Sequence, residues 1–370
     1  MNFDFSDEQK MLRDQARRFL EDNCSSETVR AILDTDTPYD ANLWKGLAEM
    51  GFQGAAIPEE FGGLGLGYLE LCVIAEELGR AVAPVPFSSS VYLASEALLM
   101  AGSDAQKSAW LPKLASGEAI GCFATAEGNQ PVSAKNLATS FDGSALTGQK
   151  VAVADGDIAD CAIVLANGKS GAVLALVDLN GEGVERRTVR TVDSTRSHAV
   201  ITFNKAPAEL LGDEGEGWSL KERVFDRAAV LIAFEQIGGA DAALAMAKDY
   251  TMERYAFGRK IASFQALKHK LADIYIGNEL ARSNAYYGAW ALSTDSAELP
   301  IAAAGARASA CDAYDFASQE NIQAHGGIGY TWEADCQLHY KRARVLSLTL
   351  GSKRYWKDLL ITRLEQKNAA

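Results

Sequence analysis

Glu235 is the residue of this chain whose surroundings most need a chemical explanation. It lies inside the apolar run AAVLIAFEQIGG, where burying an unpaired carboxylate costs several kcal/mol. A carboxylate in such a setting could act as a proton-abstracting base. The same position suits a hydrogen-bonded acid in a core or an interface, or an acid on an exposed face. The sequence alone leaves these three interpretations open.

The cysteines and histidines indicate no metal centre. The six cysteines are scattered without a CxxC pair, and no two of the four histidines have the spacing of metal ligands. Scattered cysteines without a disulfide framework are typical of reduced thiols in the cytoplasm. We therefore predict a cytoplasmic protein without a metal.

Charge and hydropathy exclude further classes of partner. The 370 residues have a formal net charge of −13, which disfavours nucleic acid and anionic membrane surfaces. The beginning, MNFDFSDEQK, is charged from its fourth residue and lacks the apolar core of a signal peptide. No apolar run approaches the roughly 18 residues of a membrane span. We expect neither a nucleic acid nor a membrane as partner.

Three segments of different texture must position any site. Residues 1–120 have helical periodicity and begin at a capping box of Ser6 and Gln9. Residues 121–212 contain short β-prone runs between turns, without the strand–helix alternation of a parallel sheet. Residues 213–370 return to long helices rich in alanine and leucine. We predict an α+β multidomain chain: an N-terminal helical domain, a middle antiparallel β-domain and a C-terminal four-helix-type bundle.

Three stretches, in this order, resemble signatures of the acyl-CoA dehydrogenase family. They are PEEFGGLGLG at 58–67, ERYAFGRKIASFQALKHKLADI at 253–274 and QAHGGIGYTWE at 323–333. The resemblance covers essentially the whole chain. It implies a flavoprotein oxidoreductase that uses FAD on acyl-CoA substrates and passes electrons to an electron-transfer flavoprotein. It also implies dimers or tetramers in which each flavin lies across a subunit boundary.

The half of the FAD site that a subunit lends to its neighbour matches the family. A family R-x-x-F-G turn places a guanidinium near pyrophosphate, and a Q-x-x-G-G loop lets backbone amides approach phosphate. His325, inside that loop, replaces an aromatic residue common in the family and is expected to be a polar residue near the phosphates. By this resemblance, the nucleotide of FAD is bound by Arg254, Phe257, Gln265, Gln323, Gly326 and Gly327.

The half that holds a subunit's own flavin departs from the family. The loop FATAEGNQPVSAK keeps Thr125 as a cofactor contact, but its Gly-Ser pair is blurred into Gln130–Ser133. The family's W-I-T strand corresponds to Ala152, Val153 and Ala154, so the indole and the hydroxyl are both missing. Backbone amides alone can contact a flavin edge, which leaves an own flavin open as an alternative.

Both positions at which family members carry the catalytic base are apolar. Leu350 precedes Gly351 where most members have a glutamate, and Ala228, next to Ala229, occupies the other position on an earlier helix. Glu235 lies on nearly the same helical face as Ala228 but about 10 Å further along the axis. It serves as a relocated base only if the substrate or the helix is shifted.

Two other acids offer no replacement for the base. Asp226 faces away from Ala228 on the helix and is expected to make a contact at the surface or toward CoA, together with Arg227. Glu127, in the degenerate loop, is expected to be exposed.

The uneven match favours one function over two others. We expect an acyl-CoA dehydrogenase subunit that lends the nucleotide half of the FAD site to a catalytic companion, as some bacterial members do, including those that act on steroid side chains. The alternative is a self-sufficient homo-oligomeric acyl-CoA dehydrogenase with Glu235 as relocated base. A second alternative is a non-redox CoA-ester-binding or scaffold protein. The acyl group is not specified by the sequence, beyond an expectation of lipid or steroid catabolism from the subfamily.

Overall fold

The computed structural model describes residues 5–369 and packs them into two compact units. The bundle unit contains the residues up to Arg30, Tyr68–Ala83 and the chain from Ala229 onward, and the sheet unit contains Ala31–Gly67 and Pro84–Ala228. The N-terminal helices are divided between the units, so the domain boundaries at 120 and 212 stay predictions. The first four residues, on which the signal-peptide prediction partly rests, lie outside the described residues.

The N-terminal third is helical, as predicted. The capping box is confirmed: the Ser6 amide donates to Gln9 Oε1 at 2.9 Å, and the Gln9 amide donates to Ser6 Oγ at 3.2 Å. The elements are α1 (Asp7–Asn23), α2 (Ser26–Leu33), α3 (Ala41–Glu49), η1 (Glu59–Phe61), α4 (Tyr68–Arg80), the π-helix η2 (Ser88–Ser95), α5 (Glu96–Ala101) and α6 (Asp104–Ala115).

A seven-stranded sheet forms the core of the sheet unit. Its order β1-β4-β2-β3-β7-β5 closes on itself through a β4–β5 pairing, with β6 beside β7. Most pairs are antiparallel, but β1–β4 and β2–β4 are parallel, so the prediction of an antiparallel domain is corrected to a mixed sheet. The long connection from β1 to β4 permits this pairing. The strands are β1 (Gly121–Ala124), β2 (Ser140–Phe141), β3 (Ala145–Ala154), β4 (Cys161–Asn167), β5 (Ala172–Asp178), β6 (Val184–Thr188) and β7 (His198–Leu211).

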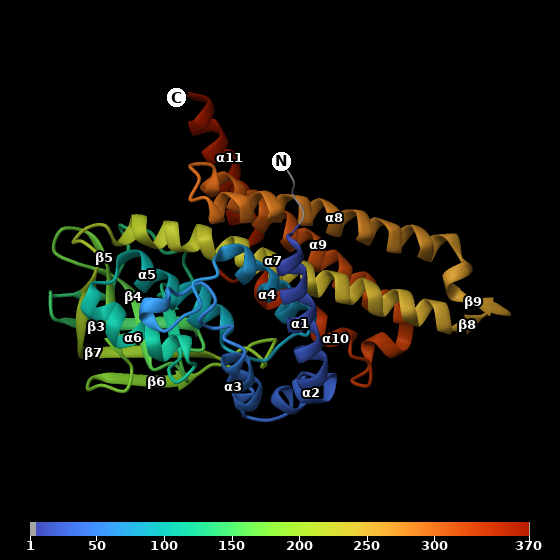
Figure 1. Cartoon of the computed structure of the whole chain (residues 1–370), viewed down its shortest axis with the longest axis horizontal. Helices are drawn as coiled ribbons and strands as arrows, with labels where there is room; N and C mark the ends of the chain where they lie inside the picture. The colour runs from blue at the N-terminus through green and yellow to red at the C-terminus, as the bar shows by residue number, and fades with distance from the viewer. Residues whose placement is uncertain (1–4, 370) are drawn as a thin grey trace. The chain divides into compact units, whose positions relative to one another are not determined.

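Long helices dominate the C-terminal part. Figure 1 shows α8 running beside α9, and a short β8–β9 hairpin joining the end of α7 to the start of α8. Alanines line the buried face of α9, because small side chains let helices pack closely. The elements are α7 (Gly217–Glu253), β8 (Tyr255–Ala256), β9 (Arg259–Lys260), η3 (Ile261–Ser263), α8 (Gln265–Ser293), α9 (Leu299–His325), η4 (Gly326–Tyr330), α10 (Cys336–Leu346) and α11 (Lys353–Ala369).

Helix α7 corrects one expectation about hydropathy. It is long and apolar enough to cross a membrane by length and composition, with a mean hydropathy of 1.4 over its most apolar window. However, 72% of that window is buried inside the protein. Its apolar surface is therefore explained by its place as the core helix of the bundle.

Two glycines bring α4 and α7 into backbone contact. A Cβ atom at Gly79 would lie 1.8 Å from the carbonyl oxygen of Glu235, and one at Gly238 would lie 1.8 Å from that of Glu76. No side chain fits at such distances, so both positions require glycine. The crossing fixes α4 against the stretch of α7 that carries Glu235.

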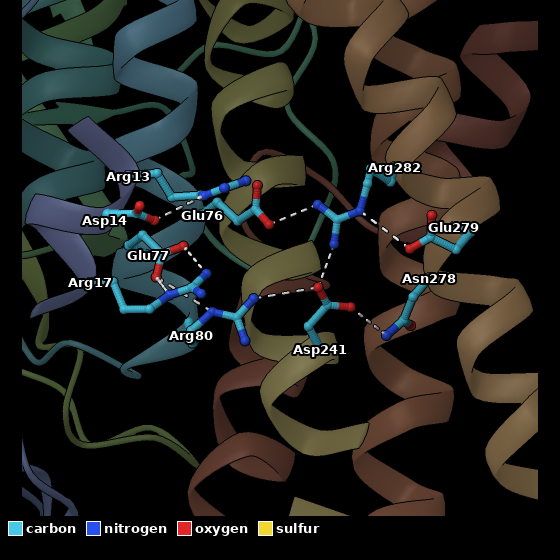
Figure 2. A network of polar contacts seen from close by, with 10 residues as sticks. All are labelled: Arg13, Asp14, Arg17, Glu76, Glu77, Arg80, Asp241, Asn278, Glu279 and Arg282. Carbon is cyan, nitrogen blue, oxygen red and sulfur yellow. Dashed lines mark hydrogen bonds and ion pairs between the residues drawn. The ribbon is translucent and has the colours of Figure 1, made fainter. Parts of the chain in front are cut away.

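A network of charged side chains fastens four helices of the bundle unit to one another. Figure 2 shows Asp241 of α7 between Arg80 of α4 and Arg282 of α8. Because each buried acid has an arginine partner, the charges are compensated in the interior. Further contacts of the network include Arg17 to Glu77 at 2.7 Å, Arg80 to Glu77 at 3.4 Å, Arg282 to Glu76 at 2.7 Å and Asn278 to Asp241 at 2.9 Å.

Candidate functional site

The hairpin after α7 presents an aromatic ring to solvent. Phe257 and Gly258 form its turn with φ values of +52° and +77°, the positive pair that a type I′ turn requires. Phe257 is 95% exposed. Its left-handed conformation is rare for phenylalanine. Arg259 packs its guanidinium over the Phe264 ring at 4.1 Å, which braces the base of the hairpin. The strain and the exposure mark Phe257 as a residue placed for an external contact.

The two other predicted residues of this segment lie next to the hairpin. Arg254 follows the last residue of α7, and its amide donates to the Tyr250 carbonyl at 2.9 Å. Gln265 is the first residue of α8, whose N-terminus has no side-chain cap among the described residues. Both side chains are exposed. A guanidinium beside an uncapped helix N-terminus suits an anionic group such as phosphate.

The glycine loop lies where α9 ends. Gly326 has φ +64° and ψ −137°, a conformation open almost only to glycine. A Cβ atom at Gly326 or Gly327 would meet no atom within 4 Å, so the backbone of the loop is open to a ligand. Gly329 serves packing instead, because a Cβ atom there would lie 2.4 Å from the Ile322 carbonyl oxygen. Gln323 is exposed on the last turn of α9.

These two segments lie at the same end of the bundle. Helices α8 and α9 pack against each other and are joined by an ion pair between Lys270 and Glu320 near this end. His325 closes α9 and stacks on Tyr250 of α7, with ring centroids 4.2 Å apart. Guanidinium, exposed ring, side-chain amides and open glycine backbone together fit the pyrophosphate and nucleotide of FAD. We call this surface the bundle end: residues 250–265 and 323–330.

The sheet-unit positions lack such groups. A bulge between Lys150 and Val153 interrupts the β3–β7 register, and Ala152 at the bulge is exposed with φ +49°. Val153 is buried, and Ala154 offers only a methyl group. Thr125, just after β1, is half-buried. Across Ala152–Ala154 no side chain supplies an aromatic ring or a hydroxyl, so these residues could contact a flavin only through their backbone or through methyl and isopropyl groups.

Glu127 is not the exposed acid that the sequence predicted. Its carboxylate accepts from the Lys150 ammonium at 2.6 Å and from the amides of Ala138 and Thr139 at 2.7 and 2.9 Å. Burial alone would raise the pKa of Glu127, but the ammonium and the amides lower it to about 2. Burial lowers the pKa of Lys150 to about 8, which the contact with Glu127 partly offsets. The pair was missed because its members are distant in sequence, and its role is to tie the degenerate loop to β3.

Glu235 lies in the interior of the bundle unit. Only 1% of it is exposed, and its Oε1 lies 3.6 Å from Nη1 of Arg342, which is fully buried. Arg342 also donates to the carbonyls of Val82 and Ala83 at 3.2 to 3.3 Å, where the chain leaves α4. Glu235 is therefore half of an ion pair that links α7, α10 and the end of α4. A charged partner gives the buried carboxylate a structural explanation.

The loop around Leu350 is held by another buried arginine. Arg307 of α9 is fully buried and donates to the carbonyls of Leu346, the last residue of α10, and of Thr349 in the loop beyond it. A cation there is favoured by the helix dipole. Leu350 itself has φ +62° and is half-buried. The loop thus has a fixed backbone but an apolar side chain at the predicted base position.

The other positions considered for the base are also apolar or occupied. Ala228 and Ala229 are fully buried. Asp226 is 5% exposed, which corrects the expectation of a surface contact. Arg227 pairs with Glu96 of α5 and is mostly buried. The two arginines of the bundle interior, Arg307 and Arg342, were missed by sequence reasoning, although a charged residue within a buried alanine-rich or apolar run is the signal that could have found them.

Comparison with known proteins agrees with this architecture. The family model "Acyl-CoA dehydrogenase, N-terminal domain" matches residues 6–118, and "Acyl-CoA dehydrogenase, C-terminal domain" matches residues 215–364. The acyl-CoA dehydrogenase IpdE2 of Mycobacterium tuberculosis is 34% identical over 352 residues, which is 94% of each chain.

Two solved structures are similar over nearly their whole length. One, described as a variant of the Tcur3481–Tcur3483 steroid ACAD, has a TM-score of 0.90 and 30% identity, covering 98% of this chain and 99% of its own. The other is the ChsE4–ChsE5 complex from Mycobacterium tuberculosis, with a TM-score of 0.90 and 26% identity, covering 100% of this chain and 99% of its own. The fold, the bundle end and these matches together show that the chain belongs to the acyl-CoA dehydrogenase family of FAD-dependent flavoenzymes.

Proposed function

We propose that this chain takes part in the α,β-desaturation of a CoA thioester as the subunit that lends the nucleotide half of the FAD site to a catalytic companion. The observation that carries this proposal is the contrast between the bundle end and β3. Phe257 is 95% exposed on a strained turn, while Ala152, Val153 and Ala154 provide no ring or hydroxyl for a flavin. Groups that serve a neighbour are retained, and groups that serve the chain's own flavin are not.

The role of this chain is to bind and orient the cofactor. Arg254 would pair with the pyrophosphate, the open backbone at Gly326 and Gly327 would donate to it, and Phe257 would pack on the cofactor. When bound, FAD would supply a hydride acceptor for the β-hydrogen of the thioester, and a carboxylate would be needed to remove the α-proton. That carboxylate belongs to the companion in this proposal, because Leu350 and Ala228 cannot exchange a proton.

The printed descriptions of relatives support a pair of unlike chains. One solved relative is a complex of ChsE4 with ChsE5, and another is a steroid ACAD named by two chains, Tcur3481 and Tcur3483. By analogy we propose a bulky CoA ester of lipid or steroid catabolism as substrate, an electron-transfer flavoprotein as acceptor and a cytoplasmic location. The oligomer would be a heteromeric dimer or tetramer.

The self-sufficient enzyme with Glu235 as base remains the second candidate. Its support is the burial of Glu235 in an apolar helix, and the ion pair with Arg342 counts against it. A non-redox scaffold is the third candidate, and the intact bundle end counts against it.

The test is the FAD content of the protein expressed alone and together with a family member encoded beside it. We expect little flavin in the lone chain and about one FAD per pair of unlike chains, measured by visible absorbance. A lone chain that holds one FAD and bleaches with an acyl-CoA would overturn the proposal. Within the pair, Arg254→Ala should weaken FAD binding about 10- to 100-fold, because it removes a charge-assisted contact. Thr125→Ala should change it little.

A further inference from the structure

The predicted FAD contacts of the bundle end come from two separate segments. Arg254, Phe257 and Gln265 surround the hairpin, whereas Gln323, Gly326 and Gly327 end α9. One ligand is held more tightly by both segments if their relative positions are fixed before binding, since ordering them at binding would reduce affinity. A contact that joins the segments is therefore needed.

The stack of Tyr250 on His325 is such a contact. The two rings lie 4.2 Å apart between centroids at an interplanar angle of 23°. Both residues are half-buried, so the stack is partly shielded from water. His325 Nδ1 lies 2.8 Å from the carbonyl oxygen of Asn321, which fixes the ring against its own helix.

Each ring is one short step from a predicted ligand contact. The Tyr250 carbonyl accepts the amide of Arg254 at 2.9 Å, so Tyr250 anchors the arginine segment. His325 directly precedes Gly326, where φ of +64° turns the chain into the open glycine loop. The stack thus connects the backbone that carries the guanidinium to the backbone that carries the glycine amides.

The start of α8 is joined to the end of α9 by an ion pair instead of a ring stack. Lys270 of α8 forms an ion pair with Glu320 of α9, and the Lys270 side chain is 44% exposed. Because the lysine is exposed, salt screens this ion pair in part. Among the ring contacts of residues 5–369, only the stack joins the end of α7 to the end of α9, and it lies beside a hydrogen bond from Asn321 Nδ2 to Met246 Sδ at 3.3 Å.

We propose that Tyr250 and His325 are a positioning pair that fixes the arginine segment against the glycine loop and so sets the affinity of the bundle end for the FAD nucleotide. This inference rests on the proposed function of the bundle end. It assigns to His325 a role through its ring face and not as a polar contact to phosphate. The chemical requirement at 325 is then a flat ring, which phenylalanine also meets.

The experiment compares His325→Ala with His325→Phe in the assembly that holds flavin, whether lone chain or pair. FAD is titrated into the apoprotein and its Kd is measured by flavin fluorescence. We expect His325→Ala to raise the Kd for FAD about five- to tenfold, the magnitude of one aromatic contact, and His325→Phe to stay within about twofold of the parent. His269→Ala, an exposed histidine on α8, is the matched control and should have no effect.

Each outcome bears on a separate claim. A Kd for His325→Ala within twofold of the parent overturns the positioning pair, as does a His325→Phe variant that binds as weakly as His325→Ala. Rescue by phenylalanine supports it, because a contact of His325 with phosphate could not be restored by a ring without nitrogen. Arg254→Ala separates the levels: if it also leaves the Kd unchanged, the proposed FAD half-site itself fails, whereas a weakened Arg254→Ala beside an unaffected His325→Ala overturns the stack alone.

Discussion

The bundle end and strand β3 are the two regions that the sequence analysis assigned to FAD, and they differ in the side chains that their strained backbones carry. Both have strained left-handed residues, Phe257 at φ +52° and Ala152 at φ +49°. At the bundle end the strain displays a phenyl ring, whereas on β3 it displays a methyl group. A strained backbone conformation can therefore carry either a ring or a methyl group, because the bulge and the turn are held by backbone pairing and not by the exposed side chain.

The largest expected effect concerns Glu235, which would be the catalytic base if the chain were a self-sufficient enzyme. We expect Glu235→Gln to lower the free energy of unfolding by about 3–5 kcal/mol, because it leaves Arg342 as a buried charge without its carboxylate. Urea denaturation measures this change. Asp249→Asn, an exposed acid on the same helix, is the control and should shift stability by less than about 0.5 kcal/mol. A Glu235→Gln protein of unchanged stability that has lost turnover as a lone chain would instead identify Glu235 as a base.

The pH dependence of the bundle unit should report on His339. Burial lowers the pKa of His339 to about 4, and its Nδ1 lies 3.1 Å from the Tyr314 hydroxyl. The unfolded chain binds a proton near pH 6.5 while the folded chain does not, so stability is full above pH 6.5 and falls as the pH approaches 4. The loss is about 3 kcal/mol at 1.36 kcal/mol per pKa unit. Urea titrations at several pH values should show that His339→Phe flattens this slope, whereas His269→Ala keeps it.

The sheet unit should respond in a lower pH window. The pKa of Glu127 is lowered to about 2 in the folded chain, so its stabilisation is present above pH 4.5 and is lost as the pH falls toward 2. We expect a loss of about 2 kcal/mol, discounted for partial solvent exposure. Glu127→Gln should remove this acid dependence in denaturation followed by circular dichroism, and Glu118→Gln, an exposed acid of the same unit, should not. An unaltered acid profile in Glu127→Gln would mean that the Lys150 contact is not a stabilising one.

Sequence reasoning located what is encoded locally. The order of helices and strands follows from periodicity, and the motif around Arg254 and Gly326 lies in contiguous stretches, so both were predictable. The pairs Glu235–Arg342 and Glu127–Lys150 join residues that are distant in sequence, so the residues around Glu235 give no indication that Arg342 is its partner. The capping of the Leu350 loop by Arg307 was likewise hidden, because an arginine in an alanine-rich helix has no local partner.

The smallest expected effect lies at the loop that carries the missing base. A left-handed conformation costs a leucine about 1–2 kcal/mol, and Leu350 adopts one at φ +62°. Leu350→Gly should relieve that strain and, after the loss of some apolar contact and the added entropy of the unfolded chain, raise stability by up to about 1 kcal/mol. Leu348→Gly, two residues earlier and outside the left-handed region, should lower stability. The urea midpoints of the two variants give the comparison.

If Leu350→Gly is stabilising, position 350 is held left-handed against the preference of its own side chain, and the restraint comes from Arg307 and the end of α10. The loop and the bulge at Ala152 then share one property: a restrained left-handed backbone with an apolar side chain. If Leu350→Gly is instead as destabilising as Leu348→Gly, the packing of the leucine outweighs the strain. Leu350 would then stabilise the loop through its apolar contacts. In that case the loop would differ from β3, where the left-handed residue Ala152 has only an exposed methyl group.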